Sequence, residues 1–493
     1  MRVSFLHNGY ESLGIEQLSA ALKKAGHETS LVIDPSLFAE AGFWKSPLLS
    51  RVFDLKKEVL KDLKADKPDL VCFSVFTDTY RWSLDWAGTV KKELGVPVVF
   101  GGIHPTSVPE HVIAEDCVDH ICVGEGDHAL PALARALSGK YAGPIDNIWS
   151  KIDGKIIKGG IAPAVSPDAL EFADKDIFYS RYPFYSGGYL ISASRGCPFS
   201  CAYCANNVYA RLYGGSAYAR KRSPDHVLAE LALAKKRWSP TFVHFTDEVF
   251  NWDPAWLKTF LERYAQEAAL PFSCYIYPDL LDAASAKLLK QAGCFKVQLG
   301  VQTFDGKRRL ETLKRPSSNK KIAEAIALLK KEGIYTVCDS ILGLPGDTSG
   351  DLRNLADFFA ENTPDQNEVF YLKYYPGTEL TGGALKDGLL TGAELSAIEN
   401  GAGPSGIIDR PGPSGRELRT FFKTLIILPF IPKVFRKHFA GGKLLARLLP
   451  GNIFLRVLLR LLRRPLYDFN TAQFVRRYRH FISLRFKLWL KPY

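Results

Sequence analysis

The stretch SRGCPFSCAYCANN, residues 194–207, places three cysteines at Cys197, Cys201 and Cys204. Their spacing is C-x3-C-x2-C, and the nearest histidine in the sequence is His226. Three thiolates can hold three irons of a [4Fe–4S] cluster and leave the fourth iron open to a substrate or cofactor. The main alternative is a structural zinc ion, which is bound by four ligands, and no fourth ligand lies nearby. The spacing therefore predicts an iron–sulfur cluster with one open iron.

The cysteines directly follow the first strand of a repeating strand–helix pattern. We expect this pattern to run over 188–395, with strand candidates at 189–196, 242–248, 272–281, 296–303, 335–343 and 368–375. Six such units suit a partial barrel, because a closed barrel of eight units needs roughly 250 residues. The cysteines then lie in the first loop at the carboxyl end of this partial (β/α)6 barrel, where such folds carry their chemistry.

The first 140 residues show a similar alternation, in which five apolar runs are each followed by a helical pattern. This predicts an α/β fold with a doubly wound, Rossmann-like parallel sheet. Ligands of such sheets bind beyond the carboxyl ends of the strands, which here carry Ser74, the segment 101–104 and the segment 124–126. Glycines there let a flat ligand approach the backbone, although ordinary turns use glycine as well. Residues 141–187, with a hairpin expected around Asp153-Gly154, are interpreted as a connector.

The last part of the chain differs from the rest in charge. From Arg416 to Tyr493 there are 18 Lys and Arg against 2 Asp and Glu, a balance of +16, whereas the preceding residues have 46 against 50, a balance of −4. We expect residues 396–493 to be a basic helical region with a separate role. No apolar run reaches the roughly 18 residues that a spanning helix needs. The N-terminus lacks a secretory signal, so a cytoplasmic protein with reduced thiols is expected.

The cysteine loop resembles that of the radical S-adenosylmethionine (SAM) enzymes, in which an aromatic residue, here Tyr203, commonly precedes the last cysteine. The resemblance implies that the three cysteines hold a [4Fe–4S] cluster as its metal ligands. It also implies that SAM binds the open iron through its amino and carboxylate groups. An electron, from a donor such as flavodoxin or ferredoxin, then cleaves SAM to methionine and a 5′-deoxyadenosyl radical.

Further segments resemble the SAM-binding motifs of this family. The acidic motif near the SAM amino group matches the end of the second strand, where acids would also suit the positive end of a helix dipole. GVQTF, residues 300–304, resembles the motif that lines the ribose, with glutamine where relatives often have glutamate. ILGLPGDT, residues 341–348, resembles the segment against the adenine. The implied SAM contacts are Thr246, Asp247, Glu248, Gln302, Ile341 and Gly343.

The first domain resembles the cobalamin-binding domain that precedes the barrel in one subfamily of these enzymes. The segments that carry the resemblance are CFSVF, FGGIHPT and VGEGD. The first strand–helix loop reads HNGYESLG and lacks the Asp-x-His-x-x-Gly motif, so the resemblance implies a cobalt without a histidine from that motif. His104 lies in the loop near the expected corrin face, where a turn role is the alternative. The implied cobalamin contacts are Ser74, Gly101, Gly102, His104 and Glu125.

The resemblance divides the chain into a cobalamin-binding domain (1–140), the connector, the radical SAM barrel (188–395) and the basic tail. It implies an enzyme that uses the cluster, SAM and cobalamin, most often to methylate an unactivated carbon, here of a small or lipid-like substrate. Oxidative cyclisation or ring rearrangement without methyl transfer is the first alternative. A membrane-associated iron–sulfur and corrinoid sensor without catalysis is the second.

Three interpretations of the basic tail stay open. NIFLRVLLRLLRRPL, residues 452–466, sets Arg456, Arg460, Arg463 and Arg464 among apolar residues at helical spacing. Basic amphipathic helices of this kind can lie in an anionic membrane surface, here the inner face of the cell membrane. The apolar side chains could instead pack on the barrel, and the basic ones could meet nucleic acid. The tail has no known RNA-binding signature, so nucleic acid is the least favoured partner.

Overall fold

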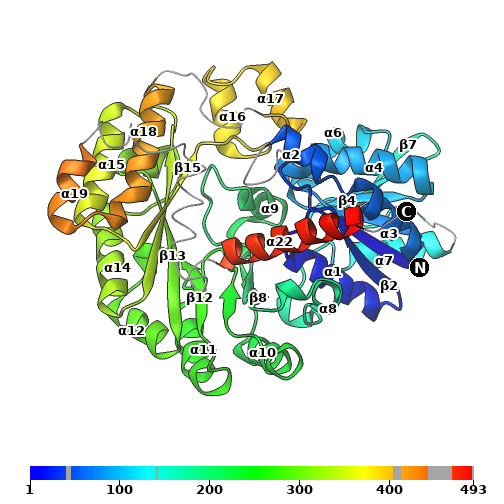
Figure 1. Ribbon diagram of the computed structural model, residues 1–493, viewed down its shortest axis with the longest axis horizontal. Helices are drawn as coiled ribbons and strands as arrows, with labels where there is room; N and C mark the ends of the chain where they lie inside the picture. The colour runs from blue at the N-terminus through cyan, green and yellow to red at the C-terminus, as the bar shows by residue number, and fades with distance from the viewer. Residues whose placement is uncertain (40–45, 140–142, 404–411, 442–468, 491–493) are drawn as a thin grey trace.

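Two sheets of mainly parallel strands, each covered by helices, form the body of the chain (Figure 1). The computed structural model describes residues 1–39, 46–139, 143–403, 412–441 and 469–490. The expected α/β architecture, with a doubly wound N-terminal unit, an open barrel and a helical C-terminal region, is confirmed for these residues.

The first unit is a sheet of seven strands in the order β2-β1-β3-β4-β5-β6-β7. The first five are parallel, so β1 lies between β2 and β3 as the doubly wound pattern requires. Its elements are β1 (Arg2–His7), α1 (Leu13–Lys24), β2 (Glu28–Ile33), α2 (Pro47–Val52), α3 (Lys56–Asp66), β3 (Leu70–Ser74), η1 (Thr77–Thr79), α4 (Tyr80–Leu94), β4 (Val98–Gly101), α5 (Ile103–Ser107), α6 (Pro109–Ala114), β5 (His120–Cys122), α7 (Ala129–Ser138), β6 (Ile148–Ile152) and β7 (Lys155–Lys158).

The expected hairpin forms at Asp153-Gly154, where both residues have positive φ. Its strands β6 and β7 do not stand apart as a linker, because β6 pairs antiparallel with β5 and extends the first sheet. The short helices η2 (Pro167–Ala169), α8 (Asp176–Tyr179) and η3 (Pro183–Tyr185) then lead to the second unit. Within this stretch Lys175 is fully buried and pairs with Glu11 and Glu16 of the first unit.

The second unit is a six-stranded parallel sheet in the order β15-β14-β13-β12-β11-β8, whose two outer strands do not pair with each other. This is the open partial barrel expected from six strand–helix units. Its elements are β8 (Tyr189–Ile191), β9 (Ser194–Arg195), α9 (Asn206–Leu212), η4 (Gly215–Tyr218), β10 (Arg220–Lys221), α10 (Pro224–Trp238), β11 (Val243–Phe245), α11 (Pro254–Glu267), β12 (Phe272–Ile276), η5 (Pro278–Leu280), α12 (Ala283–Gln291), β13 (Cys294–Gln302), α13 (Gly306–Glu311), α14 (Asn319–Lys331), β14 (Tyr335–Leu342), α15 (Ser349–Glu361), β15 (Gln366–Tyr371), α16 (Glu379–Lys386) and α17 (Gly392–Glu399).

The alternation of side chains along β13 decides what faces the inside of the barrel. Val297, Leu299 and Val301 are buried in one core cluster with residues of the outer helices. Because successive residues of a strand point to opposite faces, Gln298 and Gln302 face the concave side of the sheet. The barrel interior is therefore polar, whereas its contact with the helices is apolar. The remaining cysteines of the barrel, Cys274, Cys294 and Cys338, are buried in the same apolar cluster, as ordinary core residues are.

The tail packs on both units. Its described helices are α18 (Gly415–Ile427), η6 (Leu428–Phe430), α19 (Lys433–Ala440) and α22 (Phe469–Leu490). Helices α18 and α19 lie against α15 at the barrel, while α22 crosses to the first unit, where Tyr478 and Phe481 join its core (Figure 1). Packing of the tail is thus observed, but the arginines of residues 452–466 lie outside the described residues. Within the described part of the chain, no helix is long and apolar enough to cross a membrane.

Candidate functional site

The three cysteines lie in the loop between β9 and α9, beyond the carboxyl end of the first barrel strand. Gly196, which precedes Cys197, has φ +77° and lies so close to Tyr218 that a Cβ would come within 2.7 Å of its ring. Such a conformation favours glycine, which has no Cβ to clash. The sequence thus begins the loop with the residue that its sharp turn requires.

The donor set of this loop fits an iron–sulfur cluster. All three cysteines are free thiols; Cys201 is buried, and Cys197 and Cys204 are half-buried. Burial raises the pKa of Cys197 to about 12 and that of Cys204 to about 11, and the nearby Glu248 carboxylate also raises both. Binding of iron must therefore displace their protons, as metal binding by thiols does. Among the described residues no three His, Cys, Asp or Glu side chains are arranged around a single metal ion.

A clamp that the sequence analysis missed holds this loop from the barrel side. The guanidinium of Arg315 donates to Cys201 Sγ at 3.8 Å and to the Gly300 carbonyl at 3.0 Å. It also lies 4.4 Å from the ring of Tyr277, and that ring stacks on Phe199 of the loop at 4.0 Å. These contacts fix both halves of the loop. They could not be read from the sequence because Arg315 and Cys201 are 114 residues apart.

The two acids at the end of β11, Asp247 and Glu248, have different surroundings. Asp247 is buried beneath the loop, where its carboxylate accepts hydrogen bonds from the Ala193 amide at 2.9 Å and from the Ser194 hydroxyl. Burial raises the pKa of Asp247. Glu248 is exposed beside the thiols, and Thr246 donates to the Ile191 carbonyl. Asp247 therefore supports the loop, while Glu248 remains accessible to a ligand.

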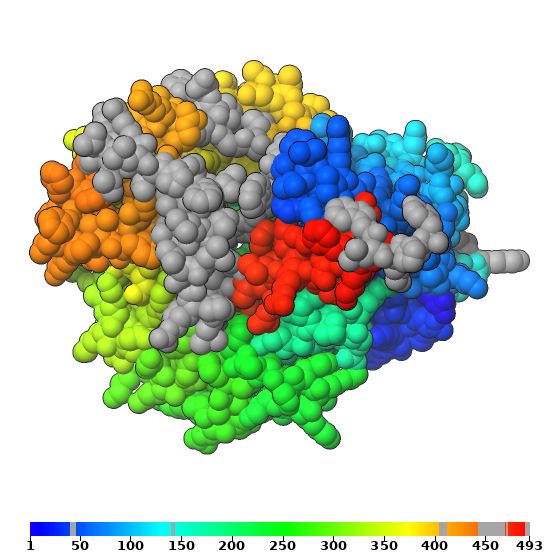
Figure 2. All heavy atoms as spheres, viewed as in Figure 1, coloured from blue at the N-terminus to red at the C-terminus, as the bar shows by residue number. Residues whose placement is uncertain are grey.

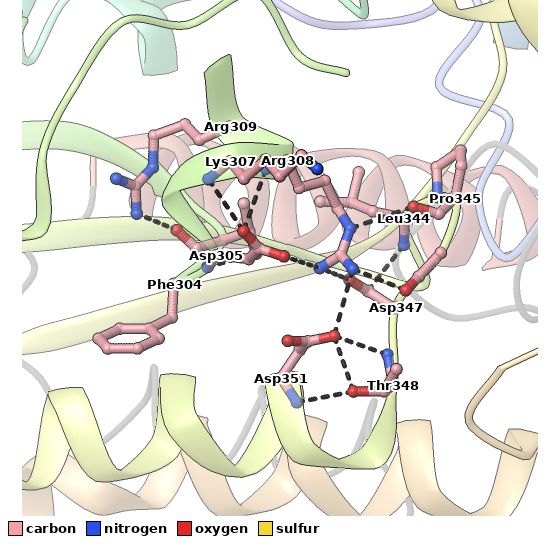
Figure 3. A network of polar contacts seen from close by, with 12 residues as sticks. Phe304, Asp305, Lys307, Arg308, Arg309, Leu344, Pro345, Asp347, Thr348 and Asp351 are labelled. Carbon is pink, nitrogen blue, oxygen red and sulfur yellow. Dashed lines mark hydrogen bonds and ion pairs between the residues drawn. The ribbon is translucent and has the colours of Figure 1, made fainter. Parts of the chain in front are cut away.

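The motifs at the ends of β13 and β14 lie side by side, joined by ion pairs (Figure 3). Arg308 pairs with Asp347 at 3.0 Å and donates to the Pro345 carbonyl at 3.1 Å. Asp347 in turn accepts from the amides of Gly343 at 3.0 Å and Leu344 at 2.8 Å. The segment that contains Ile341 and Gly343 is thus tied to the helix that follows Gln302.

Gln302 itself is buried and has φ +67°, a conformation that is uncommon for a residue with a side chain. Its amide folds back over Gly300, where a Cβ would overlap with it and would also come within 3.1 Å of Arg315. Gln302, Gly300 and Arg315 therefore form one packed group beside the cysteine loop. A Cβ at position 300 would have to displace the ends of the Gln302 and Arg315 side chains.

A half-buried carboxylate lies on the concave face of the barrel next to this group. Asp339 pairs in register with Gly300 and accepts from Gln298 Nε2 at 2.8 and 3.0 Å. Burial raises the pKa of Asp339 to about 7, and the nearby Glu368 acts in the same direction. Asp339 can therefore hold or release a proton near neutral pH. The sequence analysis did not single it out, because a lone Asp in a strand has no distinguishing motif.

The carboxyl edge of the first sheet is built largely from backbone. Ser74 ends β3, Gly101 ends β4, and Gly102 has φ +103° with a Cβ position only 3.0 Å from the Val75 carbonyl. The predicted contact His104 is fully buried instead, with Nδ1 3.1 Å from the Thr77 hydroxyl and its ring 4.2 Å from that of Tyr80. His104 thus packs inside the first unit. It does not line the cavity described next.

The two edges face one cavity of about 360 Å³. The first unit lines it with Ser74, Gly101, Gly102 and Glu125, over an apolar floor that includes Phe5 and Leu13. The barrel lines the opposite side with residues 194–196, immediately before the first cysteine. A flat ligand with an apolar tail fits such a glycine rim and apolar floor.

Ion pairs cross between the two units at the rim of this cavity. Arg195 donates to both carboxylate oxygens of Asp127, at 2.6 and 2.8 Å, and Arg220 pairs with Glu125. Glu125 also accepts from the Val165 amide at 3.0 Å. Because Arg195 precedes the cysteine loop by one residue, the bidentate pair ties the loop directly to the first unit.

Two family profiles match the chain. Residues 6–134 match the B12 binding domain, and residues 191–359 match the radical SAM superfamily. The first match covers the parallel strands of the first sheet from the end of β1, and the second match covers most of the barrel sheet from the end of β8 and stops before β15.

Relatives with assigned names are similar at low identity. A methyltransferase of Pyrococcus horikoshii described as uncharacterised is 25% identical over 68% of this chain and 73% of its own length. The anaerobic magnesium-protoporphyrin IX monomethyl ester cyclase of Rubrivivax gelatinosus is 24% identical over 77% and 69%. The hopanoid C-3 methylase of Methylococcus capsulatus is 26% identical over 75% and 68%.

The fold is also similar to a solved structure. The radical SAM methyltransferase TsrM from Kitasatospora setae, with cobalamin and a [4Fe–4S] cluster bound, superimposes with a TM-score of 0.64. The identity is 19%, and the match covers 78% of each chain. The order of the two units along the chain is therefore shared with a solved fold.

Proposed function

Because the chain carries a radical SAM domain behind a B12-binding domain, and so uses a [4Fe–4S] cluster, SAM and cobalamin, we propose that it methylates an unactivated carbon of a small or lipid-like substrate. The observation that carries this proposal is the cavity shared by the two carboxyl edges, with the cysteine loop beginning at its rim. A carbon of this kind offers no lone pair for direct attack on SAM. Two cofactors beside one another, a radical source and a methyl carrier, meet that requirement.

The chain's own residues bind and orient these groups. We assign the iron ligands to Cys197, Cys201 and Cys204, in a loop that Arg315 and Tyr277 hold in place. When bound, the cofactors supply a carbon-centred radical and a transferable methyl group, and the protein positions them and excludes water. The proposed SAM contacts are Thr246, Glu248, Gln302, Ile341 and Gly343, with Asp247 acting through the loop. The proposed cobalamin contacts are Ser74, Gly101, Gly102 and, at the rim, Glu125; His104 supports the turn from inside.

The experiment is an anaerobic incubation of reconstituted protein with SAM that carries a trideuterated methyl group. Cell extracts and lipid extracts serve as substrate pools, and mass spectrometry reads the products. We expect 5′-deoxyadenosine together with a product that contains the trideuterated methyl. Formation of 5′-deoxyadenosine without any labelled product, although a substrate is consumed, would contradict methyl transfer.

Oxidative cyclisation is the second candidate, favoured by the similarity to the cyclase of Rubrivivax gelatinosus over 77% of this chain. Its product loses hydrogen and gains no labelled methyl group, so the same experiment separates the two reactions. A sensor without catalysis would produce no 5′-deoxyadenosine at all.

We further propose two partners. An external one-electron donor of the flavodoxin or ferredoxin type would reduce the cluster. The basic tail, with its +16 balance, would contact the inner face of an anionic membrane. Exposed apolar side chains on its helices support this contact, because Val434 is 81% and Phe435 57% exposed. Co-sedimentation with anionic and neutral vesicles, at low and high salt, tests the membrane contact.

A further inference from the structure

The long tail helix α22 has two basic faces that differ in their partners. On the inner face, Arg477 donates to the carbonyls of Asn8 and Gly9 at 3.1 and 2.6 Å. Arg485 donates to the Val52 carbonyl at 3.1 Å. These two guanidiniums therefore attach the helix to the first unit and are not available to a ligand.

The outer face carries three cations without such partners. These cations are Arg476, Arg479 and Lys487, and all three are exposed. None of them forms a hydrogen bond or ion pair with the described part of the chain. Their spacing places them along one side of the helix. From Phe469 to Leu490 the helix has no Asp or Glu in its sequence, so nothing on the helix itself neutralises them.

These cations border a surface groove of about 360 Å³ between α22 and the η3 turn. The half-buried ring of Phe184 forms one wall and lies 5.0 Å from the ring of His480. Ser483 and Leu484 complete the lining. Burial lowers the pKa of His480, and the nearby Lys487 lowers it further, so its neutral ring supplies one N–H donor. The groove thus combines two guanidiniums, an ammonium, a hydroxyl and an imidazole, with no acidic group in its lining.

This set of donors matches a phosphate group. Guanidinium forks bind phosphate oxygens in a bidentate manner, and lysine adds a point charge. Leu484 in the lining of the groove is 36% exposed, and Val475, next to Arg476 in the sequence, is 45% exposed. A soluble phosphate compound would make no contact with these apolar side chains, whereas the acyl chains of a phospholipid would lie beside them.

We infer that the groove formed by Phe184, Arg476, Arg479, His480 and Lys487 binds the phosphate of an anionic phospholipid. This inference rests on the membrane contact proposed above and refines it by assigning one phosphate-binding site to a face of α22. Helix α22 lies at the surface between the barrel and the first unit, as Figure 2 shows. It places a lipid phosphate on the helix that bridges the two halves of the molecule.

The test uses full-length protein and vesicles of phosphatidylcholine with or without phosphatidylglycerol. The variant Arg476→Gln/Arg479→Gln removes two cations of the groove. The matched control Lys258→Gln/Lys287→Gln removes two exposed cations from the outer barrel helices α11 and α12 and changes the net charge equally. Near an anionic surface each basic side chain contributes about 1 kcal/mol, so the groove variant should bind phosphatidylglycerol vesicles about 10- to 30-fold more weakly. The control should stay within about twofold of wild type, because its lysines lie on barrel helices and do not line the groove.

The outcomes separate the groove from the membrane proposal. The groove is wrong as the lipid site if wild type binds phosphatidylglycerol vesicles and both variants bind them equally weakly, or if both bind them as well as wild type. In that case another part of the tail makes the membrane contact. If wild type ignores phosphatidylglycerol vesicles, the membrane contact is wrong, and the lipid assignment of the groove falls with it. Glycerol 1-phosphate and inorganic phosphate form the soluble arm: binding of either one, lost in the groove variant, would reassign the groove to a soluble phosphate. Melting temperatures of both variants equal to wild type establish that folding is intact.

Discussion

The carboxyl edge of the first sheet and that of the barrel border the same cavity, but the first edge presents backbone and the second presents side chains. At the first edge Ser74, Gly101 and Gly102 present backbone and almost no side chain. At the barrel edge the loop presents three thiols, with Glu248 and Arg315 beside them. The first edge is shaped to let a large flat group come close, and the second edge to supply ligands and charge. The difference supports the proposed assignment of cobalamin to the first edge and of the cluster and SAM to the second.

The strongest way to break this comparison is to remove a ligand from the barrel edge. Replacing Cys201 by Ala should abolish iron binding and 5′-deoxyadenosine formation, because the cluster loses one of its three protein ligands. Iron content and deoxyadenosine yield after anaerobic reconstitution measure this. The control is Cys274→Ala, in the apolar core, which should keep both. Wild-type deoxyadenosine production by the Cys201 variant would refute the assignment.

At the first edge the corresponding change adds one carbon atom. Gly102→Ala should weaken cobalamin binding about 100-fold, because a Cβ at φ +103° would lie 3.0 Å from the Val75 carbonyl and would displace the rim. Strain of this kind costs about 1–3 kcal/mol. Titration of the apoprotein, followed by corrin absorbance, gives the Kd. Gly95→Ala is the control, since its φ is also positive, at +69°, but no atom lies within 4 Å of the added carbon. Equal affinities for the two variants would show that the rim is not the binding surface.

The barrel edge contains the half-buried acid Asp339, and its raised pKa predicts that the stability of the protein depends on pH. Burial raises the pKa of Asp339 to about 7, whereas an Asp in an unfolded chain has a pKa near 4. Between these values the folded protein holds a proton that the unfolded chain has lost. Stability is therefore full below about pH 4 and declines as the pH rises towards about 7. The decline is on the order of 2 kcal/mol or more.

Replacing Asp339 by Asn should remove this decline. Chemical denaturation at pH 5 and pH 8, followed by a probe in the barrel, should show a smaller loss of stability for Asp339→Asn than for wild type. The exposed Asp387→Asn serves as the matched control and should behave as wild type. A loss in the Asp339 variant as large as in wild type would mean that another group titrates.

The smallest expected effect concerns charge beside the cluster. Arg315→Gln removes the cation that contacts Cys201 Sγ. Since a nearby positive charge stabilises the reduced, more negative cluster, its loss should lower the midpoint potential by on the order of 50 mV. Redox titration followed by paramagnetic resonance measures the potential. Arg315→Lys keeps the charge and should recover most of it, whereas equal potentials for Gln and Lys would assign Arg315 to packing alone.

The sequence predicts those features that repeat or that need special residues. Alternating strands and helices predict both sheets, and the barrel strands lie within a few residues of their expected positions. The cysteine spacing and the glycines at residues 101–102 mark the two edges. Contacts between distant residues carry no such signal: the clamp of Arg315 on Cys201 and the crossing of α22 to the first unit depend on how the elements pack.

Charge counting also has a clear limit here. It identifies the tail as basic, but it does not distinguish Arg477, which donates to two backbone carbonyls, from its neighbour Arg476, which faces outwards. His104 is a similar case, because the sequence left open whether it contacts the corrin or serves a turn, whereas the structure buries its ring beside Tyr80. Whether such a side chain is exposed or packed inside depends on the face of the helix it occupies and on the direction of the chain, and residue type alone does not show it.

The crossing of α22 sets an order of events during synthesis of the protein. Tyr478 and Phe481 belong to the same apolar cluster as the strands of the first sheet, and the Tyr478 hydroxyl accepts a hydrogen bond from the Phe38 amide at 3.3 Å. The core of the first domain is therefore complete only after a helix some 440 residues further along the chain has been synthesised. A nascent chain that stops short of α22 has an incomplete core in this domain. Cobalamin is thus expected to bind only to chains that include α22.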